Sequence, residues 1–177
     1  MTDKGFEIFE QMKSFLSFGP EDAAHLRRLG PLMMPHQPRL TDAFYAQLAL
    51  HPPTAKLIEG RVQALKQTHA AWFAELFNGE YGRAYFDRRW RIGLAHVRIG
   101  LDPFWVEVVM SLIRGIGGEA LSGAPDENAL RSALLKILDL DLLIINLSYQ
   151  EDRLDRLTEF TGLKRPLIEN IIRIPRK

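Results

Sequence analysis

Hydrophobic side chains recur along this chain every three to four residues, which is the spacing of one face of an α-helix. The period-two alternation of a half-buried strand does not recur along it. Prolines and glycines punctuate the pattern and indicate where helices begin and end. The predicted helical stretches are residues 6–19, 19–33, 38–53, 53–59, 60–79, 80–100, 103–121 and 125–157. The fold class is therefore predicted to be all-α, with about seven or eight helices.

The C-terminal end of the chain differs from the rest in character. Helical periodicity is continuous up to about residue 157, whereas residues 158–177 read as a connector or as the start of a further module. Residues 1–157 are therefore interpreted as one helical domain, and 158–177 as a linker or the start of a truncated C-terminal output module.

Composition and charge exclude several classes of protein. The 177 residues include 23 basic and 22 acidic side chains, so no basic excess points to nucleic-acid binding. Because cysteine is absent, the chain cannot form disulfides, Cys-ligated metal centres or thioether links to haem. The longest apolar run, 142–147, is too short to span a membrane, and the N-terminus lacks a signal-peptide core. These features favour a cytoplasmic protein with no membrane partner.

Two of the five histidines lie within apolar stretches on consecutive predicted helices. His69 is in phase with Leu65 and Trp72, and His96 is in phase with Ile92 and Ile99. A single histidine on an apolar face is more often a hydrogen-bonded core residue than a ligand. Two imidazoles beside one apolar slot, however, suit haem iron, because neutral imidazole is a good iron ligand.

The motifs of other metal and phosphate sites are missing from the sequence. It contains no H-E-x-x-H, no pair of Glu-x-x-His motifs, no G-x-S-x-G and no P-loop. The glycines of 115–118 follow no predicted strand, so a phosphate-binding role is disfavoured and a helix end or kink is the simpler interpretation.

The stretch "RIGLAHVRIGLDPFW", residues 91–105, closely resembles the globin domain of the globin-coupled sensors, the family of haem sensors related to protoglobins. The family pattern there is I-G-x-x-H-x-x-I-G-[LIV]-x-P-x-W. "AFY" at 43–45 and "LKQTHAAWFAELFNGEY" at 65–81 are similar to two further segments of the family in the same order. The resemblance covers residues 5–157 and implies a globin fold with an extra N-terminal helix.

This resemblance implies the identity of the haem ligands. His96 matches the proximal axial ligand of a non-covalent haem b (iron protoporphyrin IX), and Tyr45 matches the distal tyrosine that can donate a hydrogen bond to a bound gas. Thr68 or its neighbour His69 occupies the place of the second distal polar group. Two alternatives stay open for His69: a second axial ligand to six-coordinate iron, or a hydrogen-bonding group above five-coordinate iron.

Other residues are expected around the haem. Those expected to contact the cofactor are Phe44, Leu65, Trp72, Phe73, Val97 and Ile99, and Met110 is a plausible further lining residue. Arginines of "DRRWR", residues 87–91, are candidates for binding the haem propionates, because a guanidinium fork suits carboxylates; a solvated face is the simpler alternative.

The resemblance implies a haem-based sensor of a diatomic gas (O2, CO or NO) or of redox state. Such a domain controls a C-terminal signalling output and has no catalysis of its own. "DRLTEFTGLKRPLIENI", residues 155–171, loosely resembles the start of diguanylate cyclases, through Thr161, Gly162, Leu163 and Arg165. The alternatives are a haem enzyme of the NO-dioxygenase or peroxidase-like type, a stand-alone O2-binding globin, and a haem-free helical interaction module.

A homodimer is expected through the last two long helices, at about residues 103–121 and 126–155. The family pairs these helices into a four-helix bundle, and the final helix carries an apolar surface larger than one globin core needs. The residues of that surface are Leu134, Leu135, Leu138, Leu142, Ile145, Tyr149 and Leu154.

Overall fold

The computed structural model describes residues 2–175, so residue 1 of the predicted sensor domain and residues 176–177 of the predicted linker lie outside the described residues. Within this range the chain forms nine α-helices and one short 3₁₀ helix, and no strand. The helices are α1 (Thr2–Phe15), α2 (Pro20–Met33), η1 (Met34–His36), α3 (Gln37–Leu50), α4 (Pro52–Ile58), α5 (Val62–Glu75), α6 (Arg83–Arg98), α7 (Pro103–Leu121), α8 (Glu127–Thr161) and α9 (Arg165–Arg173). The all-α prediction is confirmed.

The helix boundaries follow local chemistry closely at α7 and less closely at the C-terminus. Pro103 starts α7, where a proline at the first turn has no N–H to leave unpaired. α8 runs to Thr161 and crosses residue 157 without a break. It ends at Gly162, whose left-handed φ of 68° suits a residue without a Cβ, and α9 then follows.

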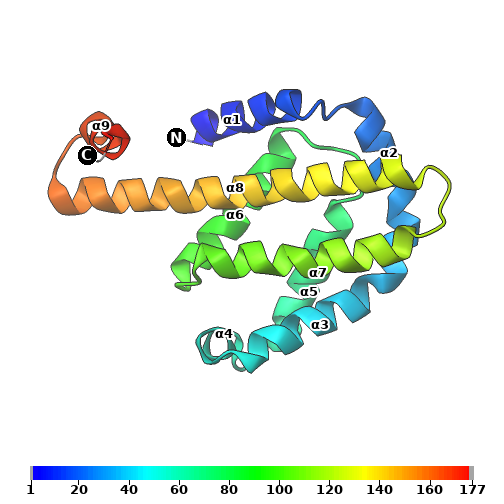
Figure 1. Ribbon diagram of the computed structural model, residues 1–177. Helices are drawn as coiled ribbons and strands as arrows, with labels where there is room; N and C mark the ends of the chain where they lie inside the picture. Colours follow the sequence, from blue (N-terminus) through cyan, green and yellow to red (C-terminus); the bar gives the residue numbers. More distant parts are fainter. Residues whose placement is uncertain (1, 176–177) are drawn as a thin grey trace.

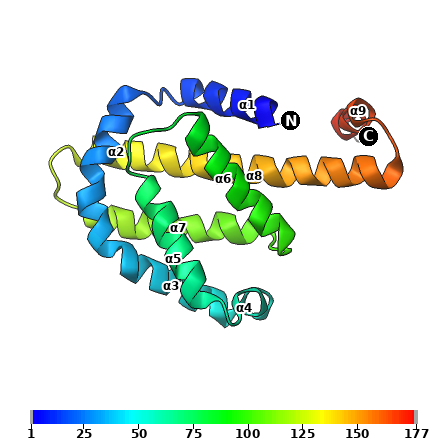
Figure 2. The ribbon, with the colours of Figure 1, turned by 180° about the vertical axis from the view of Figure 1, so that it is seen from behind.

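The long helix α8 is the axis of the fold (Figure 1). α7 runs beside it, and α1 lies along its other side. The reverse view in Figure 2 shows that α6 crosses α8, whereas α5 crosses α7. The C-terminal end of α8 projects past α7 and leads to α9, which lies near the start of α1 in both views. Lys4 Nζ and Glu169 Oε1, 3.5 Å apart, link α1 to α9 across this gap.

The close approach of α6 to α8 depends on Gly93. A Cβ at this position would lie 1.8 Å from Ser148 Oγ and 2.9 Å from the Ile145 carbonyl oxygen. Because no side chain larger than hydrogen fits there, glycine lets the two backbones pack directly. This contact lies one turn before His96 on α6, so it fixes the position of the His96 backbone relative to α8.

The apolar surface predicted on α8 is mostly buried within the single chain. Leu134, Leu138, Ile145, Tyr149 and Leu154 are all buried, and Leu142 is half-buried. The physical argument for a surplus dimer stripe was therefore wrong for these residues, because α1, α2, α6 and α7 cover them. The apolar side chains that α7 and α8 expose within residues 103–155 are Phe104, Val108 and Leu135.

Candidate functional site

An apolar cavity opens between α3, α4, α5, α6, α7 and α8. The space that the centre of a water molecule can reach inside it is about 180 Å³, more than ten times what one water needs. Eight of the ten residues predicted to bind the cofactor line this one cavity: Phe44, Tyr45, Leu65, Thr68, His69, Trp72, His96 and Ile99. The fold thus brings together side chains from three separate segments of the sequence.

His96 comes to the cavity from the last turn of α6. Its Nδ1 is buried with no hydrogen-bond partner among the described residues. Burial lowers the pKa of His96 to about 4, so the imidazole is neutral at physiological pH and keeps a nitrogen lone pair. A neutral imidazole on a cavity wall keeps a lone pair available for a metal, whereas a core histidine rarely leaves a buried ring nitrogen without a hydrogen-bond partner.

His69 reaches the same cavity from α5. Its ring stacks on Phe44, with centroids 4.8 Å apart and an interplanar angle of 12°, and its Nδ1 lies 2.9 Å from Thr41 Oγ1. Burial lowers the pKa of His69 to about 4, which also leaves it neutral. Since Nδ1 is engaged by Thr41, Nε2 is the nitrogen left for a ligand.

Tyr45 lies on α3 beside the two rings just described. Its ring centroid is 4.8 Å from that of Phe44 and 6.1 Å from that of His69. Burial raises the pKa of Tyr45 to about 12, so its hydroxyl stays protonated and able to donate. The cavity therefore combines two neutral imidazoles with one phenol.

Two of the predicted cofactor residues lie elsewhere. Phe73 is fully buried in the main core against Phe77, and Val97 packs beside Val106 and Tyr149. Neither lines the cavity. Because adjacent residues point about 100° apart on a helix, the neighbours Trp72 and His96 take the cavity positions instead.

Sequence reasoning missed much of the cavity wall and one polar contact. The lining also includes Leu48, Thr54, Leu57 and Ile58 from α3 and α4, Trp105, Val106, Val109 and Ile113 from α7, and Leu101 and Ile145; the expected Met110 is there too. Thr41, the partner of His69, was also missed. Its position four residues before Tyr45, on the same face of one helix, was the signal available in the sequence.

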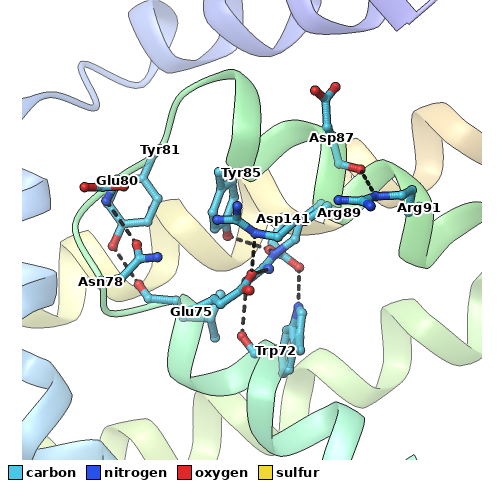
Figure 3. A network of polar contacts seen from close by, with 12 residues as sticks. Trp72, Glu75, Asn78, Glu80, Tyr81, Tyr85, Asp87, Arg89, Arg91 and Asp141 are labelled. Atoms are coloured by element: carbon cyan, nitrogen blue, oxygen red, sulfur yellow. Dashed lines mark hydrogen bonds and ion pairs between the residues drawn. The ribbon is translucent and has the colours of Figure 1, made fainter.

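A polar network centred on buried Asp141 includes Trp72, which also lines the cavity (Figure 3). Trp72 Nε1 donates to Asp141 Oδ2 at 2.9 Å, and Asp141 Oδ1 accepts from the Tyr85 hydroxyl at 2.5 Å and from Arg89 Nε at 2.6 Å. Arg89 also pairs with Glu75. Burial by itself lowers the pKa of Arg89, but Asp141, Tyr85 and Glu75 together outweigh that effect, and the pKa is raised.

Arg89 is therefore neither a propionate ligand nor part of a solvated face, the two roles that its sequence position suggested. Its side chain is 1% exposed. The neighbouring Arg88 is also engaged, with Nε 3.0 Å from Glu75 Oε2. A guanidinium can be buried in this way because carboxylates and a carbonyl satisfy its donors.

The donor set fits haem better than a metal ion held by the protein alone. Within residues 2–175 no group of three or more His, Asp or Glu side chains is arranged to hold a metal ion. Haem brings four nitrogen ligands of its own and needs from the protein one or two axial groups and an apolar slot. The unpartnered imidazole of His96 and the apolar cavity supply both.

The helical fold and the apolar pocket are those of a globin. The globin domain of a Geobacter sulfurreducens globin-coupled sensor is similar, with a TM-score of 0.74 and 36% identity over 79% of this chain and 96% of that one. The globin domain of E. coli DosC in its ferrous form shares the fold, with a TM-score of 0.63 and 12% identity over 78% of this chain and 97% of that one.

The Protoglobin family model matches residues 7–155. The chain belongs to the protoglobin family, and its globin fold implies haem binding. This confirms the family resemblance found in residues 91–105. Across residues 2–175, none of the helices has the length and apolar character needed to cross a membrane.

Proposed function

We propose that this chain is the haem b domain of a gas sensor, with His96 as the proximal axial ligand. The observation that carries the proposal is that two neutral imidazoles and a phenol line the wall of one apolar cavity. The bound haem supplies an iron atom that takes a diatomic gas, and the sensed ligand is O2, CO or NO. The proposed attachment is non-covalent, and the lack of cysteine excludes thioether links to the haem.

His69 is the second axial ligand in the absence of gas. Its Nδ1 is occupied by Thr41, its ring is held against Phe44, and its neutral state leaves Nε2 free to coordinate. With haem bound there, a gas would compete with His69 for the iron, so the contacts of His69 inside the domain would differ between the gas-bound and gas-free forms. A sensor needs such a change, whereas an oxygen store does not.

Tyr45 acts as the donor to the bound gas. Its hydroxyl stays protonated, and it lies beside the residue that must move away. A donor at this place stabilises a ligand that carries partial negative charge and discriminates O2 from CO.

Optical spectroscopy of the purified protein tests this assignment. A Soret band establishes the haem, and a sharp low-spin ferrous spectrum that disappears in His69→Ala supports six-coordinate iron. A five-coordinate ferrous spectrum in the unmodified protein assigns His69 to hydrogen bonding instead. Steady turnover of nitric oxide with O2, or of peroxide, shifts the assignment from sensor to haem enzyme.

The output lies C-terminal to the globin core and is reached through α8. This helix extends to Thr161 and is continued by α9, where residues 158–177 serve as the linker or the start of an output module such as a diguanylate cyclase. The dimer proposed for residues 103–121 and 126–155 rests on the exposed side chains of Phe104, Val108 and Leu135.

Sedimentation velocity tests the dimer. Val108 is 61% exposed, so Val108→Glu leaves the fold intact and places a charge in the proposed interface. We expect the unmodified protein to sediment as a dimer and the variant as a monomer. Leu50→Glu, at a 70% exposed position on α3, is the matched control and should stay dimeric.

A further inference from the structure

Trp72 touches the cavity and α8 at the same time. Its ring centroid is 5.1 Å from that of His69, while its indole N–H donates to Asp141 of α8 at 2.9 Å. One rigid side chain therefore contacts the imidazole that is proposed to move and a carboxylate in the middle of the longest helix. The two contacts are on the same bicyclic ring, so neither can shift without the other.

Asp141 is a fixed anchor for this indole. It is fully buried, and its two oxygens accept hydrogen bonds from Trp72, Tyr85 and Arg89 (Figure 3). Arg89 in addition donates to the Trp72 carbonyl oxygen at 3.1 Å and pairs with Glu75. Because the loss of any one donor would leave the buried Asp141 carboxylate poorly satisfied, rearrangement of these hydrogen bonds is costly and the network is rigid.

The link joins two helices that otherwise have different packing partners. α5 packs most extensively on α3, whereas α8 packs on α6, α7, α2 and α1. Seven residues separate Asp141 from Ser148, the residue against which Gly93 of α6 packs. This is about two turns, or roughly 10 Å along one face of α8. The helices that carry His69 and His96 thus both contact that face.

We propose that Asp141 is a positioning residue of the haem pocket, which holds the Trp72 indole against His69 and thereby couples the position of His69 to α8. The inference rests on the proposed haem sensor function. When His69 leaves the iron, the packing on one side of the indole changes. The hydrogen bond on its other edge then transmits that change to α8, the helix that leads to the output.

The test compares two tryptophan variants of the haem-loaded protein. Trp72→Phe keeps an aromatic ring and removes the N–H, so the ring beside His69 is no longer hydrogen-bonded to Asp141. Trp90→Phe is the matched control, because Trp90 is a buried tryptophan that packs against Gly5 and Phe86 outside the haem cavity. Carbon monoxide is the probe ligand.

We expect Trp72→Phe to change the carbon monoxide association rate on the order of tenfold, the size of one hydrogen bond to a charged group. The ferrous spectrum should shift toward five-coordinate iron, while Trp90→Phe keeps the unmodified rate and spectrum. Haem-loaded Trp72→Phe with an unchanged rate and spectrum overturns the inference and leaves the proposed function standing. If the unmodified protein takes up no haem, that result overturns the proposed function itself.

A second measurement needs no haem. Hydrogen exchange of the three indole N–H groups, followed by nitrogen-edited NMR, should show Trp72 as the most slowly exchanging. Tyr85→Phe removes one of the donors to Asp141 and should speed the exchange of Trp72 while leaving that of Trp90 and Trp105 unchanged. Equal rates for all three indoles in the unmodified protein overturn the role of Asp141 as an anchor.

Discussion

The hydroxyl of Thr41 on α3 lies 2.9 Å from Nδ1 of His69 on α5. The same oxygen accepts a hydrogen bond from Gln37 Nε2 at 2.6 Å. A hydroxyl oxygen has two lone pairs, so it can also accept from the His69 Nδ1–H. That arrangement places the proton of the neutral imidazole on Nδ1 and leaves the Nε2 lone pair for iron. Metal-bound histidines are commonly oriented by a hydrogen bond of this kind from the other ring nitrogen.

Thr41→Val should therefore weaken the coordination of His69. Valine has the shape of threonine but leaves Nδ1 buried without a partner, so the affinity of His69 for iron falls on the order of 10- to 100-fold. The ferrous optical spectrum measures the fall as a gain in five-coordinate haem. Thr158→Val is the control, since the Thr158 hydroxyl bonds only to the Leu154 carbonyl oxygen of its own helix. A spectrum unchanged by Thr41→Val would show that Thr41 does not orient His69.

His96→Ala should abolish stable haem binding. The variant removes the proposed proximal ligand and leaves space for an imidazole, so added free imidazole should restore a Soret band. His36→Ala, at the 3₁₀ helix η1, makes the same substitution away from the cavity and should bind haem normally. Haem retention by His96→Ala without imidazole would contradict the assignment.

The stability of the haem-free protein should fall as the pH falls from about 6.5 to about 4. Burial lowers the pKa of both His69 and His96 from 6.5 to about 4, so the unfolded chain binds more protons than the folded one within that window. The free energy of unfolding then decreases with falling pH, by on the order of 1 to 3 kcal/mol per histidine at the acid end.

Urea unfolding between pH 6.5 and 5 measures this dependence where most carboxylates remain ionised. The double variant His69→Leu, His96→Leu lacks both titrating groups and should show a flatter dependence on pH. Equal slopes for the two proteins would mean that the histidines are not buried in the neutral form.

Gly93→Ala should destabilise the fold and loosen the haem. The added Cβ meets Ser148 Oγ, which can rotate, and the Ile145 carbonyl oxygen at 2.9 Å, which cannot move without shifting α8. Overpacking of this kind costs about 1–3 kcal/mol. Gly115→Ala on α7 is the control, because nothing lies within 4 Å of its Cβ position; it should instead stabilise by about 0.5–1 kcal/mol. Thermal unfolding that ranks the two variants in the opposite order would refute the packing argument.

The helices were predictable wherever a local signal decided them. α7 matches its predicted range because Pro103 marks its start, and the apolar faces of α5 and α6 follow from spacing alone. The C-terminus was less predictable. α9 is amphipathic, but a nine-residue helix is stable mainly through its contacts. Arg165 provides such a contact by pairing with Glu151 on α8 at 2.5 Å, and it also pairs with Glu169 within α9 at 3.1 Å.

The sequence by itself determined that the chain is all-α and that His69 and His96 lie on apolar helix faces. It also showed that residues 91–105 resemble a family of haem-based globin sensors. Only the tertiary structure decided that Trp72 rather than Phe73 lines the cavity, that Thr41 holds His69, and that Arg89 is buried against Asp141. Helical periodicity reports which residues of a helix share a face. It does not report which other helix covers that face, because that depends on packing between residues far apart in the sequence.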